Sequence, residues 1–147
     1  MNAHAANPAL TNLASASTKT THDKLVLATR ILTGLIWVVF GLNGFLHFMP
    51  IPPLPSKAGA FMGALAATGY MFPLIKGTEV LGGLLLLTGR FTPIGLVLLA
   101  PVAVNILAFH VFLAPAGTIM PLLLIAGGLF LAWQHRDIYA PVLGFKN

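Results

Sequence analysis

Residues 72–113 read FPLIKGTEVLGGLLLLTGRFTPIGLVLLAPVAVNILAFHVFL, and this stretch decides the fold class. Two apolar runs, residues 72–88 and 94–113, are separated by the short segment Gly89–Pro93. Neither run shows the polar and apolar alternation of a transmembrane barrel strand. Each run approaches the roughly 20 residues that an α-helix needs to cross the hydrocarbon core of a bilayer. The stretch therefore predicts two membrane-spanning helices joined by a tight turn.

Similar apolar runs lie on both sides of this helical hairpin. Because helices satisfy their own backbone hydrogen bonds in lipid, we predict an all-α, four-helix transmembrane bundle. Its spans are expected at about 25–48, 72–88, 94–113 and 119–133. After the first span, the segment PIPPLP (50–55) cannot continue a helix. Residues 57–70 then predict a short extra helix that is interfacial or re-entrant.

The composition of the whole chain agrees with a membrane protein. Of its 147 residues, 57% are hydrophobic and 7% are charged, against roughly 25% charged in soluble domains. This composition excludes a water-soluble monomer, and it excludes disorder over most of the chain. The chain has no cysteine, so it cannot supply a disulfide scaffold or thiolate ligands for a metal or an iron–sulfur cluster.

The two ends of the chain differ from the apolar middle. Residues 1–24 are polar and predict a flexible N-terminal tail that is helical only near its end; residues 138–147 predict a short C-terminal tail. Four spans place both termini on one side of the membrane. That side collects most of the basic residues: Lys19, Lys24, Arg30, Arg90, Arg136 and Lys146. The positive-inside rule therefore predicts cytoplasmic termini, and basic residues scattered in this way favour the lipid bilayer over nucleic acid as the partner.

Glu79 is the main candidate for chemistry, because it lies near the middle of the second span. A charged side chain there costs about 2.5–3.5 kcal/mol on insertion scales, so it should face the bundle interior, protonated or paired. It could bind a proton, ion or ligand, or it could form an ion pair that fixes helix packing. Two partners are in range: Arg30 from the first span, and Lys76 three residues earlier on the same helix. Either cation could instead extend to the membrane surface.

Two asparagines and two histidines within the predicted spans are further candidates: Asn43, His47, Asn105 and His110. Asn43 and His47 share a face of the first span, and His47 and His110 lie at similar depths. Three interpretations stay open: a two-histidine haem or metal site, a polar pocket for a small ligand such as a quinone ring, or residues that serve packing and the interface. Two histidines without a third ligand are a weak metal signal, so packing is favoured over haem. No catalytic triad and no metal-ligand set can be assembled.

Three stretches of the sequence resemble the DoxX family of small bacterial membrane proteins. They are TRILTGLIWVVFGLNGFLHF (29–48), YMFPLIKGTEVLGGLLLLTGRFTPIGLVLLAPVAVNILAFHVFLAP (70–115) and FLAWQHRDIY (130–139). The resemblance covers about residues 25–137, and residues 76–90 are its most characteristic part. It implies a four-helix bundle in the bacterial cytoplasmic membrane.

The resemblance also implies a function. DoxX-like proteins are associated with quinone-linked or stress-related redox systems, so we expect an accessory membrane subunit that works with a redox or assembly partner. Such a subunit is not expected to be catalytic alone, and a quinone is the cofactor to consider. The residues that carry over are Arg30, Glu79 and Asn105, with His47 and His110 as weaker additions. The alternatives are an assembly or scaffold protein without a ligand, which could form a homo-oligomer, or a small transporter.

Overall fold

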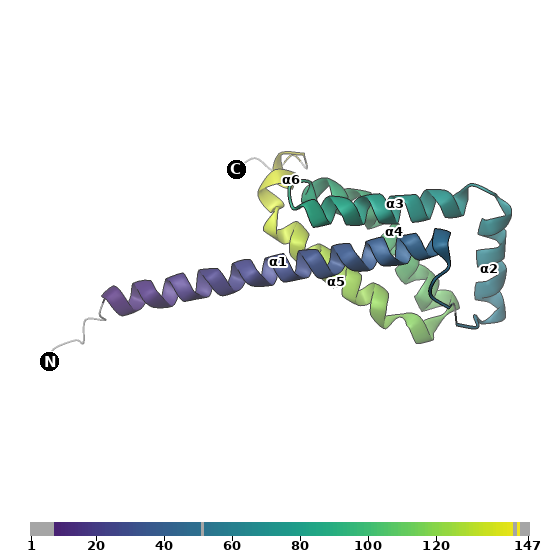
Figure 1. Cartoon of the computed structure of the whole chain (residues 1–147), viewed down its shortest axis with the longest axis horizontal. Coiled ribbons are helices and arrows are strands. Elements are labelled where there is room, and N and C mark those ends of the chain that lie inside the picture. Colours follow the sequence, from purple (N-terminus) through teal and green to yellow (C-terminus); the bar gives the residue numbers. More distant parts are fainter. Residues whose placement is uncertain (1–7, 51, 143, 145–147) are drawn as a thin grey trace.

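The computed structural model describes residues 8–50, 52–142 and 144, and most of that length is helical (Figure 1). The elements in chain order are α1 (Pro8–Leu46), α2 (Ser56–Ala67), α3 (Met71–Thr88), α4 (Thr92–Leu113), the 3-10 helix η1 (Pro115–Gly117), α5 (Ile119–Gln134) and α6 (Arg136–Val142). No strand occurs among the residues described. The predicted all-α class is therefore confirmed.

The four long helices pack in a ring. Helix α1 contacts α3 and α5, and α4 contacts the same two helices from the other side. Helix α2 connects the end of α1 to the start of α3 and lies across that end of the molecule (Figure 1). This arrangement is compatible with the predicted helical bundle.

Three helical segments are long and apolar enough to cross a membrane. They are Lys19–Leu46, Met71–Thr88 and Thr92–Leu113. Helix α5 has 16 residues and reaches the required length only together with α6, from which it is separated by a bend of 79°. The described chain thus has three helices that could span a membrane, or four if the bent pair is one span. This supports a multi-pass membrane protein.

Glycines bring the helices of the bundle close together. A Cβ atom on Gly83 of α3 would lie 2.8 Å from the backbone oxygen of Gly34 on α1, and a Cβ on Gly95 of α4 would lie 2.9 Å from the backbone oxygen of Gly82. Small residues at such crossings let backbones approach, which is how helices gain packing contacts in lipid. The buried core of Trp37, Leu86, Leu99 and Leu131 lies beside these crossings.

The N-terminal prediction was wrong in its extent. Helix α1 begins at Pro8, although we expected helix only near the end of residues 1–24. The sequence contains no glycine or proline between Pro8 and Gly34, so nothing interrupts the helix once it has started. The first part of α1 extends beyond the other helices (Figure 1). Residues 1–7 lie outside the described residues.

The C-terminal tail is also more helical than predicted. Residues 136–142 form α6, and the hydroxyl of Tyr139 in this helix donates to the backbone oxygen of Pro93 in the first turn of α4 (2.9 Å). Residue 143 and residues 145–147 of the predicted tail lie outside the described residues. The remaining limits of the predicted spans agree with the structure to within about two residues, the usual uncertainty of helix ends, whereas the short helix predicted at 57–70 ends earlier, at Ala67.

Candidate functional site

The main feature of the bundle interior is a cavity of about 900 Å³ between helices α1 to α5. This volume lies in the range of small-molecule sites, which are mostly apolar with a few polar groups. The lining here follows that pattern, because aliphatic, aromatic and methionine side chains surround four polar ones. The polar residues at the cavity are Lys76, Glu79, Asn105 and His110.

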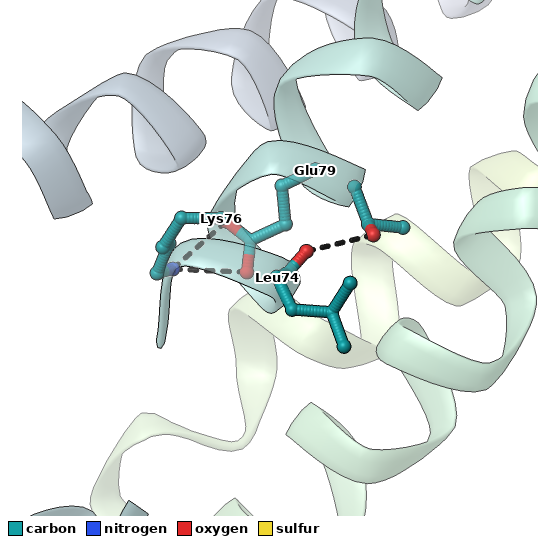
Figure 2. Close-up of polar contacts among 4 residues, drawn as sticks. Leu74, Lys76 and Glu79 are labelled. Atoms are coloured by element: carbon teal, nitrogen blue, oxygen red, sulfur yellow. Dashed lines mark hydrogen bonds and ion pairs between the residues drawn. The ribbon is translucent and has the colours of Figure 1, made fainter. Parts of the chain in front are cut away.

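Lys76 and Glu79 form an ion pair on one face of α3. The Nζ atom of Lys76 donates to both carboxylate oxygens of Glu79, at 2.9 and 2.8 Å (Figure 2). The side chain of Glu79 is 1% exposed and that of Lys76 is 21% exposed. A buried carboxylate needs such a partner, because an unpaired charge would be strongly disfavoured there. The prediction that Glu79 faces the interior and is paired is therefore confirmed, with Lys76 as the partner.

The packing of α1 against α3 explains why Lys76 stays beside Glu79. Gly44 of α1 lies so close to the aliphatic stem of Lys76 that a Cβ on this glycine would overlap it. One turn earlier, a Cβ on Gly41 would lie 3.0 Å from the Cβ of Glu79. Both glycines leave room for the two charged side chains, so the ion pair lies between the helices instead of extending to the membrane surface.

Arg30 does not pair with Glu79, contrary to one of our two predictions for this carboxylate. Its Nη1 atom donates to the backbone oxygens of Leu86 (2.9 Å) and Leu87 (3.1 Å). These carbonyls belong to the last turn of α3, where backbone oxygens lack helical partners. The guanidinium also lies against Gly89, the residue with φ 74° that ends the helix. Arg30 therefore caps α3 and lies outside the cavity.

Asn105 and His110 both lie on α4 and line the cavity. The Nδ2 atom of Asn105 donates to the backbone oxygen of Pro101 at 2.9 Å. The Nδ1 atom of His110 lies 2.8 Å from the backbone oxygen of Ile106. Because a carbonyl oxygen only accepts, Nδ1 carries the hydrogen, and the neutral ring has its lone pair on Nε2.

Asn43 and His47 do not join this group. Asn43 Oδ1 accepts from the backbone N–H of Met49 at 2.7 Å, so it stabilises the turn that follows α1. His47 is exposed, has φ 52°, and is not part of the cavity lining. The idea that His47 and His110 share a haem or metal site therefore has no support in the geometry. No cluster of three or more His, Asp or Glu side chains that could hold a metal occurs in the described part of the chain.

The contribution of α2 to the cavity was missed by the sequence analysis. Phe61, Met62 and Leu65 of this helix form one wall, and the ring of Phe61 lies 5.8 Å from that of Phe109 on α4. The signal was present as the spacing of these three residues, which places them on one face of a helix. We had interpreted the segment only as interfacial or re-entrant.

Comparison with known proteins gives no relative from which a function can be transferred. No protein-family model, curated protein or solved structure matches the chain.

Proposed function

We propose that the protein is a membrane-embedded accessory subunit of a quinone-linked or stress-related redox system. In this proposal it is a DoxX-like protein of the bacterial cytoplasmic membrane, with both termini cytoplasmic and α2 at the opposite surface. Its role is to bind a lipophilic molecule of the quinone type in the large cavity that helices α1 to α5 line. The resemblance of residues 25–137 to that family supplies the redox context.

One observation carries the proposal: a large apolar cavity has a buried ion pair and two uncharged polar side chains in its wall. The apolar residues suit a ring and its aliphatic tail. Lys76, Glu79, Asn105 and His110 supply hydrogen-bonding groups for a polar head. Several lining residues are exposed, with Phe112 the extreme at 81%, so a molecule dissolved in the bilayer could reach the cavity sideways.

Electrons for any redox step would come from a partner protein. The chain has no cysteine, which removes the usual protein ligands of iron–sulfur clusters and the dithiol relay. The part of the chain that the structure describes also shows no cluster of metal-ligating side chains. The proposed subunit holds or delivers the quinone and does not reduce it alone.

The first experiment is extraction and identification of lipophilic molecules from the protein purified in mild detergent, together with an absorption spectrum. We expect a quinone to co-purify with the wild type. The variant Ala108→Phe places a large ring on the cavity wall without touching the ion pair, and it should lose the quinone. Ala100→Phe is the matched control, because Ala100 lies exposed on the same helix outside the cavity lining and should retain it.

Other outcomes would replace the proposal. Wild-type protein that carries no quinone and takes up none when it is added would favour the scaffold function. Equal retention of quinone by both variants would place the binding site outside the cavity. A Soret band in the spectrum would instead indicate haem.

A further inference from the structure

We infer that the cavity selects a ligand whose head is uncharged and bears a hydroxyl group, and that Asn105 and His110 accept hydrogen bonds from it. This inference rests on the proposed function and names the chemistry of the ligand head. It favours a hydroquinone over the corresponding quinone, and it disfavours fatty acids and other charged amphiphiles.

The packing of α3 against α4 places Asn105 at the level of the ion pair. Gly82 lies against Leu99, and four residues further along α3, Leu86 lies against Gly95, four residues earlier on α4. The two helices are therefore antiparallel. Continued by about one and two-thirds turns toward the start of α3, the same register brings Lys76 to the depth of Asn105. A ligand head at this depth would meet both helices.

The charges at this level already neutralise each other. Lys76 donates to both oxygens of Glu79, and no other Lys, Arg, Asp or Glu belongs to the cavity lining in the described residues. A charged ligand head would lose its hydration on entering a site that offers no unpaired opposite charge, and this desolvation is unfavourable. An uncharged head meets no such penalty.

The free hydrogen-bonding groups on α4 are acceptors. Asn105 uses Nδ2 on the backbone oxygen of Pro101, which leaves its Oδ1 without a partner among the residues that the structure describes. His110 uses Nδ1 on the backbone oxygen of Ile106, so the lone pair of Nε2 is likewise uncommitted within the described ranges. Both residues line the same cavity, so their two acceptors are matched by donors on the ligand, and a hydroxyl is the uncharged donor that an aromatic head most readily offers.

The quinone and hydroquinone forms of one molecule share a carbon skeleton, and they differ in whether their oxygens can donate a hydrogen bond. The quinone presents carbonyl oxygens, which only accept and would face the lone pairs of Asn105 and His110. The hydroquinone presents two hydroxyl groups that donate. Two additional hydrogen bonds at the weak end of the ordinary range together correspond to about tenfold in affinity, so we expect the hydroquinone to bind about tenfold more tightly.

The test measures binding of three probes by calorimetry under anaerobic conditions in detergent: decylbenzoquinone, decylhydroquinone and decanoate. The wild type should bind the hydroquinone most tightly and decanoate least. Asn105→Leu and His110→Phe each remove one acceptor and should reduce the preference for the hydroquinone to about threefold or less, because each loses roughly half of the additional hydrogen bonding. Val104→Leu is the control, since Val104 is 61% exposed outside the cavity lining and its substitution should leave the preference unchanged.

The possible failures are distinguishable. Equal binding of the quinone and hydroquinone, or a preference for decanoate, would overturn this inference and leave the proposed function intact. A hydroquinone preference that survives in both Asn105→Leu and His110→Phe would overturn the assignment of these acceptors. No binding of any probe by folded wild-type protein would overturn the proposed function and this inference with it.

Discussion

The two halves of α3 lie in opposite kinds of surroundings. From Gly82 to Thr88 the helix packs closely: Gly82, Gly83 and Leu86 are buried, and Arg30 caps the last turn. From Met71 to Glu79 the same helix packs against Gly41 and Gly44 of α1 on one side and borders the large cavity on another. We call these the packed half and the cavity half of α3.

The difference separates structural charge from charge that a ligand can reach. In the packed half the guanidinium of Arg30 donates to backbone carbonyls and lies against Gly89, outside the cavity lining. In the cavity half the ion pair of Lys76 and Glu79 lies in the wall of an open space. Arg30 and Lys76 both lie within the predicted spans of the sequence, so it is the packing around each cation that decides its role.

The largest loss of stability is expected when the ion pair of the cavity half is broken. Lys76→Met leaves the buried carboxylate of Glu79 without a partner, and removing one member of a buried pair costs about 3–5 kcal/mol. The double variant Lys76→Met/Glu79→Gln removes both charges and should regain much of that stability. Thermal unfolding in detergent of the wild type, both single variants and the double variant gives the coupling energy.

Glu79→Gln alone should cost less than Lys76→Met. Lys76 is 21% exposed, so a freed ammonium group can turn toward water or lipid headgroups. A Lys76→Met protein as stable as the wild type would mean that this ion pair does not hold the cavity half together.

Alanine substitutions of glycine should change stability by a smaller amount, and differently in the two halves of α3. In the packed half, a Cβ on Gly83 would lie 2.8 Å from the backbone oxygen of Gly34 and 2.9 Å from the Cβ of Trp37. Gly83→Ala must therefore push α1 away from α3, and such overpacking costs about 1–3 kcal/mol.

Gly77→Ala is the matched substitution in the cavity half. A Cβ at Gly77 would have no atom within 4 Å beyond its own helix. Since alanine favours a helix over glycine by up to about 1 kcal/mol, this variant should be neutral or more stable. Midpoints of thermal unfolding compare the two variants directly, and equal losses in both would show that the halves do not differ in packing.

The fold was predictable from the sequence where local signals are strong. The spans at 72–88 and 94–113 are apolar runs limited by glycine and proline, and the structure places α3 and α4 there. The start of α1 was not predictable from hydropathy, because residues 9–24 are largely polar but contain no glycine or proline that would break a helix. Polar residues disfavour a membrane span in this segment, but they do not prevent a helix, and our prediction treated the two as one.

The site was predictable in part. Glu79 stands out because it is the one acidic residue within the predicted spans. Its partner was not predictable, since both Arg30 and Lys76 lie within reach by depth. Close approach at Gly44 and Gly89 decides between them, and such contacts depend on how whole helices pack. The cavity depends in the same way on where the short helix α2 lies.

The smallest effect concerns the cap of the packed half. Arg30→Gln removes the hydrogen bonds of the guanidinium to the backbone oxygens of Leu86 and Leu87, together with a positive charge at the C-terminal end of α3. Both changes are unfavourable, and together they should cost about 1–2 kcal/mol.

Arg90→Gln is the control for this cap. Arg90 follows Gly89 in the α3–α4 connection, next to the end of α3 that Arg30 caps. Its side chain is exposed, with the guanidinium 5.6 Å from the ring centroid of Phe91. Its substitution should change stability by about 0.5 kcal/mol or less, as is usual for surface positions. Quinone binding should persist in both variants, because neither residue lines the cavity. Loss of binding in Arg30→Gln without loss of folded protein would mean that the two halves of α3 are coupled, and that the packed half sets the geometry of the ion pair.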